Sequence, residues 1–130
     1  MFCPYPPTDV EARLEAVVGE FARLTVETEP ELRAMLRLSL DPDPADGGDL
    51  ALRKGRGIVW FEDALAPLRG RIPEAGFRRL VLAIRSAVGI EALVWLTDIA
   101  GLSREEAVER MLWSARAMLA LAVAEAARAT

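Results

Sequence analysis

The stretch that decides the fold runs from Gly89 to Ala107 and reads GIEALVWLTDIAGLSREEA. Its first half is apolar enough to be buried, yet it carries two carboxylates, Glu91 and Asp98. Gly101 suits the position just after a helix, because glycine readily adopts a left-handed backbone. The segment Ser103–Glu106 has the pattern of a capping box, which opens a helix. We therefore expect one helix to end near residue 100 and another to begin at residue 103.

On the N-terminal and C-terminal sides of this stretch, apolar residues recur at helical spacing. Residue patterns that typically begin or end a helix flank these segments. The segments Thr8–Glu11 and Thr28–Glu31 read as helix starts, and Asp41–Asp49 reads as a turn-rich loop. The predicted helices lie at about 9–27, 30–40, 50–69, 74–100 and 103–128. No stretch alternates with period two, so the predicted fold class is all-α. We expect a lead-in at residues 1–8 and one helical domain at residues 9–130, whose last two helices form an antiparallel hairpin.

Composition narrows the function classes. The 130 residues carry a formal net charge of −4, which argues against direct nucleic-acid binding. The chain has no histidine and one cysteine, so we expect no zinc site, no metal, no cofactor and no enzymatic activity. The single thiol and the absence of a signal-peptide pattern at the start indicate a cytoplasmic protein. Leu80–Ala100 approaches the length of a membrane span, but Arg85, Glu91 and Asp98 interrupt it, which favours a buried helix and no membrane partner.

The predicted helix 74–100 is apolar on two sides, so both sides must be covered. One side combines small residues with leucines, and helix 103–128 offers a similar stripe. Two such hairpins would close into a four-helix bundle across a two-fold axis, which predicts a homodimer. A monomer that buries both stripes is the alternative. The predicted interface residues are Leu82, Ser86, Gly89, Leu93, Leu96, Met111, Ser114, Met118 and Leu121.

The other side of helix 74–100 carries Glu91, Trp95 and Asp98, with the acids about 10 Å apart along the axis. A buried carboxylate needs a partner, so each acid pairs with an arginine, faces a wet cavity or contacts a ligand. Trp60 and Trp95 are possible walls of a pocket, although either can equally belong to a filled core. The arginines considered as partners are Arg37, Arg53, Arg56, Arg78 and Arg79.

Three segments together resemble the C-terminal part of TetR/AcrR-type transcriptional regulators: Pro30–Leu40, Arg56–Leu68 and Val88–Val123. The phrase that includes GIEALVWL carries most of the likeness. The resemblance implies a five-helix domain that binds a small, mostly apolar effector and dimerises through its last two helices. It also implies that the effector cavity is lined by Met35, Trp60, Phe61, Glu91, Trp95 and Asp98.

The chain departs from that family pattern at its start, because no helix-turn-helix precedes the first predicted helix. The resemblance therefore implies a regulatory domain without a DNA-binding module of its own. Two alternatives stay open. The first is a helical interaction or structural module without a pocket beside Trp95, such as a truncated regulator that forms heterodimers. The second is a small enzyme that uses Glu91 or Asp98.

Overall fold

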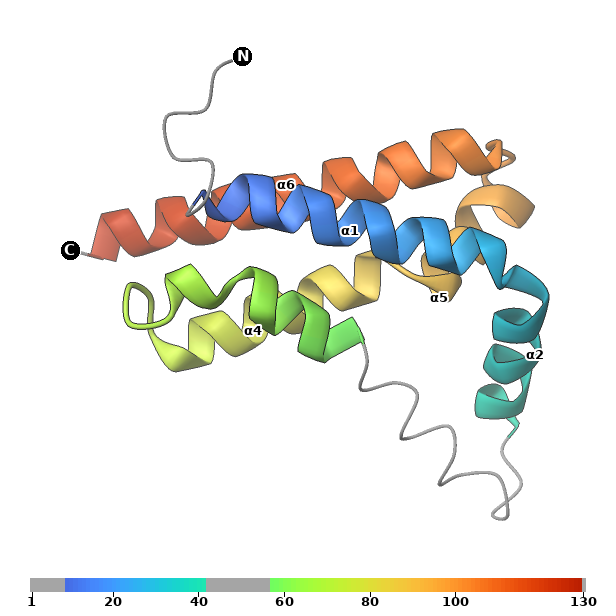
Figure 1. Ribbon diagram of the computed structural model, residues 1–130, viewed down its shortest axis with the longest axis horizontal. Helices are drawn as coiled ribbons and strands as arrows, with labels where there is room; N and C mark the ends of the chain where they lie inside the picture. Colours follow the sequence, from blue (N-terminus) through green and yellow to red (C-terminus); the bar gives the residue numbers. More distant parts are fainter. Residues whose placement is uncertain (1–8, 42–56, 130) are drawn as a thin grey trace.

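The computed structural model describes residues 9–41 and 57–129, which are helical through most of their length (Figure 1). The helices are α1 (Val10–Glu27), α2 (Glu29–Leu40), α4 (Glu74–Ala87), α5 (Ile90–Val94) and α6 (Arg104–Ala129). Residues 57–64 are also helical, a 3-10 turn spans Ala66–Leu68, and a π-helical turn spans Trp95–Ile99. The described residues contain no strand, and the predicted all-α class is confirmed for them.

The predicted helix starts are confirmed most closely at α6. The Ser103 hydroxyl accepts from the Glu106 amide at 3.1 Å, and the Glu106 carboxylate accepts from the Ser103 amide at 3.0 Å. This reciprocal pair is the predicted capping box. At α1 the capping side chain is Asp9, which accepts from the Glu11 amide at 3.0 Å. The predicted role of Thr8 lies outside the described residues.

The third predicted helix is described only in part. Its predicted residues 50–56 and most of the predicted loop before them lie outside the described residues. Within the described part, the helix gives way to a turn at Leu65, which is earlier than the predicted end at residue 69. Pro67 lies in the 3-10 turn that follows, and Gly70 has a φ of 82°. Both features are ordinary breakers of a regular helix.

The prediction of one continuous helix over residues 74–100 is wrong, because the chain breaks at Val88 and Gly89. Val88 is extended, with φ −132° and ψ 122°, and Gly89 has φ 138°. Only glycine adopts that second conformation without strain. α5 then begins and passes into the π-helical turn, whose Ala100 amide donates to the Trp95 carbonyl at 3.0 Å. The predicted stop is confirmed, since Gly101 has φ 80° directly after this turn.

The core lies where α1 and α4 pack against α6 (Figure 1). α1 buries positions four apart, from Leu14 through Val18 to Ala22, which form one face of the helix. α6 buries Ala107, Met111, Ala115 and Leu119 at the same spacing. Phe61 and, on α4 itself, Phe77 belong to the same core and are almost fully buried. This core positions the junction between α4 and α5 next to α1 and α2.

Glu74–Ile99 is long and apolar enough to cross a membrane by length and composition. In the most apolar window of this segment, 39% is buried within the protein. Core helices of soluble proteins meet the same criterion, and the break at Gly89 divides this segment into two helices. Length and composition therefore do not assign a membrane location to it.

Candidate effector pocket

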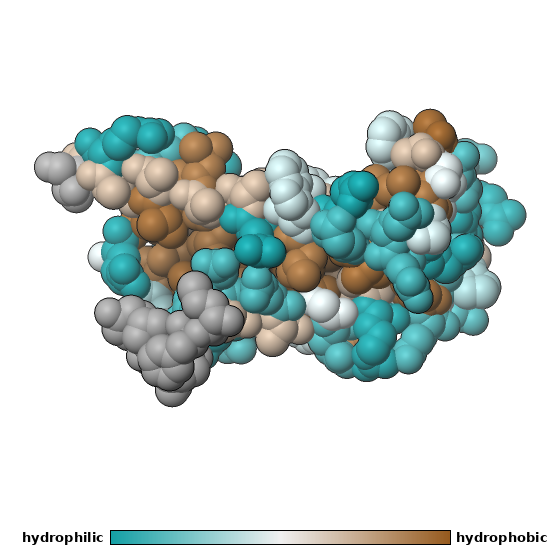
Figure 2. Space-filling view, turned by 90° about the horizontal axis from the view of Figure 1, so that it is seen from above, coloured by the Kyte–Doolittle hydropathy of each residue, from teal (hydrophilic) through white to brown (hydrophobic). Residues whose placement is uncertain are grey.

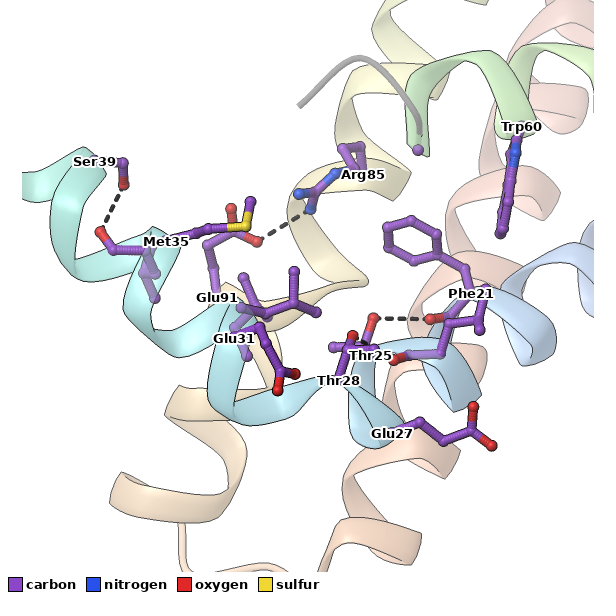
Figure 3. Close-up of a pocket in the computed structure, with 15 residues that line it drawn as sticks. Phe21, Thr25, Glu27, Thr28, Glu31, Met35, Ser39, Trp60, Arg85 and Glu91 are labelled. Atoms are coloured by element: carbon purple, nitrogen blue, oxygen red, sulfur yellow. Dashed lines mark hydrogen bonds and ion pairs between the residues drawn. The ribbon is translucent and has the colours of Figure 1, made fainter. Parts of the chain in front are cut away.

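A pocket of about 770 Å³ lies between α1, α2 and the junction of α4 with α5 (Figure 3). Its size falls within the roughly 300–1,000 Å³ of small-molecule sites. The apolar lining consists of Phe21, Leu24, Leu32, Met35, Leu36, Trp60 and Ile90. The polar lining consists of Thr25, Glu27, Thr28, Glu31, Ser39, Arg85 and Glu91, and Gly57 completes the wall.

Arg85 reaches the pocket from α4 because two glycines leave space for its side chain. A Cβ atom on Gly57 would lie 3.0 Å from the Arg85 Cδ, and one on Gly89 would lie 2.5 Å from its Nη1. Nη1 donates to the Val88 carbonyl at 3.0 Å and to the Glu91 carboxylate at 3.1 Å. The break in the chain therefore creates the carbonyl that orients this arginine and places Glu91 beside it (Figure 3).

Aromatic rings join the pocket wall to the core. Phe21 meets Trp60 edge-on, with ring centroids 5.8 Å apart, and it meets Phe61 at 5.3 Å. The Arg85 guanidinium carbon lies 5.5 Å from the Phe21 centroid, on the pocket side of this group. Edge-to-face contacts and cation–π contacts of this kind add roughly 0.5–1.5 kcal/mol each to simple burial. They hold Phe21 in place as a wall of the pocket.

The structure places some of the residues predicted to line the cavity in the pocket and others outside it. Met35, Trp60 and Glu91 do line the pocket. Phe61 does not, because it is fully buried in the core beneath Phe21. Trp95 is 55% exposed and Asp98 is half exposed, and neither lines the pocket.

Sequence reasoning missed the part of the pocket that α1 and Arg85 supply. Phe21 and Leu24 belong to an apolar stripe of α1, which gave no sign that one end of the stripe faces a cavity. Gly57 and Gly89 were the available signal for Arg85, because glycine permits close approach of a neighbouring side chain. The rest of that arrangement depends on the break at Gly89.

Asp98 belongs to an ion-pair network whose residues do not line the pocket. Arg33 donates to both Asp98 oxygens at 2.9 Å and to Glu29 at 2.7 Å. Arg104, at the start of α6, donates to Glu29 at 2.6 and 2.8 Å. The Arg104 hydrogen bonds are the main reason that the pKa of Glu29 falls to about 2, against an opposing effect of burial. The Arg33 hydrogen bonds lower the pKa of Asp98.

Both acids in the apolar first half of the quoted stretch, Glu91 and Asp98, are therefore paired with arginines, which is one of the predicted alternatives. The partners are Arg85 for Glu91 and Arg33 for Asp98, which are different from the arginines considered in the sequence. Of those, Arg53 and Arg56 lie outside the described residues. Arg79 instead pairs with Glu125 of α6 at 2.7 Å.

The predicted interface residues have different environments within one chain. Leu82, Ser86 and Leu121 are exposed, at 43% for Leu82 and 56% for Leu121. Three others are half-buried: Leu96, Ser114 and Met118. The remaining three are buried within the chain itself: Gly89, Leu93 and Met111. One flank of α4 therefore faces water in the single chain, and the last three residues cannot meet a second copy without opening the core.

Comparison with models of known protein families, with curated proteins and with solved structures finds no match. Within residues 9–41 and 57–129, no group of three or more Asp, Glu, Cys or His residues is arranged to hold a metal ion. The pocket and its neighbouring ion pairs are therefore the features of the described residues that bear on function.

Proposed function

We propose that this chain is a regulatory domain of the TetR type, which binds a small, mostly apolar effector and forms a homodimer. It acts by binding and does not catalyse a reaction. The observation that carries the proposal is the pocket of about 770 Å³, whose wall is apolar over most of its area. A net charge of −4 supports a role without direct nucleic-acid contact, and the single cysteine supports a cytoplasmic location.

Several features support ligand binding at this pocket over a filled core. The aromatic contacts of Phe21 hold one wall, and the Arg85 pair with Glu91 holds another. The wall is therefore fixed before a ligand arrives, which lowers the entropy cost of binding. A lining that is apolar over most of its area and includes polar groups is also typical of small-molecule sites.

Dimerisation is supported by apolar side chains that the single chain leaves exposed. Leu82 on α4 and Trp113, Leu121 and Val123 on α6 are each at least 41% exposed. Figure 2 shows apolar surface in the half of its face that holds the C-terminal part of α6. α4 lies beside α6, and the Arg79–Glu125 pair joins them. In our proposal a second copy covers this surface through a two-fold axis.

Binding of N-phenyl-1-naphthylamine, a neutral dye that becomes fluorescent in apolar sites, tests the effector pocket. Leu36→Trp adds bulk to a pocket residue, whereas Leu38→Trp adds it on the same helix at an exposed position outside the pocket. We expect dye binding at micromolar concentration, a loss of at least about tenfold in affinity in Leu36→Trp, and no change in Leu38→Trp. Absence of dye binding, or equal binding by the two variants, contradicts the proposal.

The alternative of a helical interaction module without a ligand is favoured by the same exposed side chains on α6. Light scattering, combined with the dye experiment, distinguishes the regulatory domain from the interaction module. A dimer at micromolar concentration that also binds the dye supports a regulatory domain. A monomer at that concentration contradicts the proposed dimer, and a dimer that binds no dye supports the interaction module.

A further inference from the structure

The joint between α4 and α5 is held by a side chain instead of by backbone hydrogen bonds. No backbone hydrogen bond between described residues joins α4 to α5. Arg85, in the last turn of α4, provides the link. Its Nη1 donates to the Val88 carbonyl within the break and to the carboxylate of Glu91 in the first turn of α5. One side chain therefore spans the break between the two helices.

The two residues of the break can change their backbone angles at low cost. Gly89 has φ 138° and ψ −166°, and glycine also adopts the angles of a helix or a strand. Val88 is extended, which is an ordinary conformation for a β-branched residue. Hinges in proteins are typically a few residues of this kind at the ends of helices. Val88 and Leu93 are fully buried, so packing limits this hinge to small changes in the angle between α4 and α5.

The pocket lies across this hinge, so its width depends on the angle between the two helices. Arg85 lines the pocket from α4, whereas Ile90 and Glu91 line it from α5 (Figure 3). α5 packs against α2, and the Arg33–Asp98 pair joins α2 to the π-helical turn that follows α5. A change in the angle therefore moves Ile90 and Glu91 relative to Arg85.

From this arrangement, we propose that the Arg85–Glu91 pair is a latch that sets the width of the pocket. While the pair is formed, it holds α5 at the observed angle to α4 and keeps the pocket narrow. The Glu91 side chain is 47% exposed, so water can replace the guanidinium at its carboxylate and the pair can separate. The hinge then turns, and the pocket accepts a bulkier ligand. The effect on ligand size rests on the proposed function, whereas the latch rests on the geometry of the hinge.

Amide hydrogen exchange followed by NMR on the full chain tests whether the pair holds the hinge. Arg85→Met removes both hydrogen bonds and keeps a long apolar side chain. Arg79→Met is the matched control, because Arg79 also lies on α4 and pairs with a glutamate, but its partner Glu125 lies on α6. We expect the amides of Leu93 and Ala100 to exchange at least about fivefold faster in Arg85→Met, while buried amides of α1 and α6 keep their rates. Arg79→Met should leave the rates of Leu93 and Ala100 unchanged.

Two neutral dyes of different size test the effect on the pocket. Nile red has a larger fused ring system than N-phenyl-1-naphthylamine, and both become fluorescent in apolar sites. Glu91→Gln keeps the size of the side chain and removes the charge that pairs with Arg85. Glu31→Gln makes the same change at another lining residue, which does not pair with Arg85. We expect the affinity for Nile red, relative to that for the smaller dye, to rise at least about threefold in Glu91→Gln and to stay the same in Glu31→Gln.

The outcomes separate the latch from the proposed function. Unchanged exchange of Leu93 and Ala100 in Arg85→Met overturns the latch. An equal increase at every amide also overturns it, because such an increase reports a loss of global stability. If the naphthylamine dye binds and the ratio of dye affinities is the same in Glu91→Gln, the effect on ligand size is wrong and the proposed function stands. If neither dye binds, the proposed function fails, and the exchange rates still decide whether the pair holds the hinge.

Discussion

The carboxylate of Glu29 is the centre of the ion pairs that join α2 to the start of α6, so its replacement tests how the helices are held together. The residue is 7% exposed and accepts three hydrogen bonds, two from Arg104 and one from Arg33. Glu29→Gln removes the charge and turns an amide donor toward two guanidinium groups. We expect this substitution to lower the free energy of unfolding.

The size of that loss follows from the pKa of Glu29. A decrease from the ordinary pKa of 4.5 to about 2 corresponds by linkage to at most roughly 3.4 kcal/mol. The side chains of Arg104 and Arg33 are 54% and 31% exposed, so water screens their ion pairs with Glu29. This screening reduces the loss of stability that the substitution causes. We therefore expect about 2 kcal/mol for Glu29→Gln at pH 7. Glu27→Gln, which breaks an exposed pair with Arg23, should change the free energy of unfolding little, because water screens exposed ion pairs.

The dependence of stability on pH has a defined sign. The pKa of Glu29 is lower in the folded protein than in the unfolded chain, so the unfolded chain binds more protons between pH 4.5 and about 2. The stabilisation is complete above pH 4.5 or so and is lost as the pH falls toward 2. Urea unfolding followed by circular dichroism should show the difference between natural protein and Glu29→Gln shrinking over that range. A difference that stays constant as the pH falls would refute the reasoning.

Three further changes are expected to have separate effects. Gly89→Ala should lower the free energy of unfolding in thermal melts by about 2–3 kcal/mol, because φ is 138° and the new Cβ would lie 2.5 Å from Arg85 Nη1. Gly101→Ala has open space around the new Cβ and should cost about 1 kcal/mol. Phe61→Ala should cost about 3–5 kcal/mol in urea unfolding because the ring is fully buried. Leu121→Glu should convert the proposed dimer to monomers in analytical ultracentrifugation while the circular dichroism spectrum stays helical, and an unchanged mass would contradict the proposed interface.

Local signals in the sequence predicted most helix bounds closely. The capping box at Ser103–Glu106 and the glycine at Gly101 act through hydrogen bonds between neighbouring residues, so their outcome depends little on the rest of the chain. The start of α1 was predicted within one residue for the same reason, although Asp9 provides the capping side chain. The all-α class follows from helical spacing of apolar residues in every described segment.

Partners of charged groups were harder to predict because they depend on how the helices are placed. In a continuous helix, Arg85 and Glu91 would lie about 120° apart around the axis and could not pair well. The extended Val88 and the left-handed Gly89 redirect the chain, so the two side chains meet at 3.1 Å. A glycine within an apolar helical pattern could be read as a small interface residue or as a break, and the spacing alone did not decide between them.

The same break explains why Glu91 and Asp98 have separate surroundings. In the predicted continuous helix, Glu91 and Asp98 share one face with Trp95 between them. In the folded chain, Glu91 lines the pocket, whereas Asp98, within the π-helical turn, meets Arg33 on α2. α2 therefore supplies residues to both features: Leu32, Met35 and Leu36 line the pocket, and Glu29 and Arg33 form the ion pairs. Through Glu29 the same helix is joined to Arg104 at the start of α6.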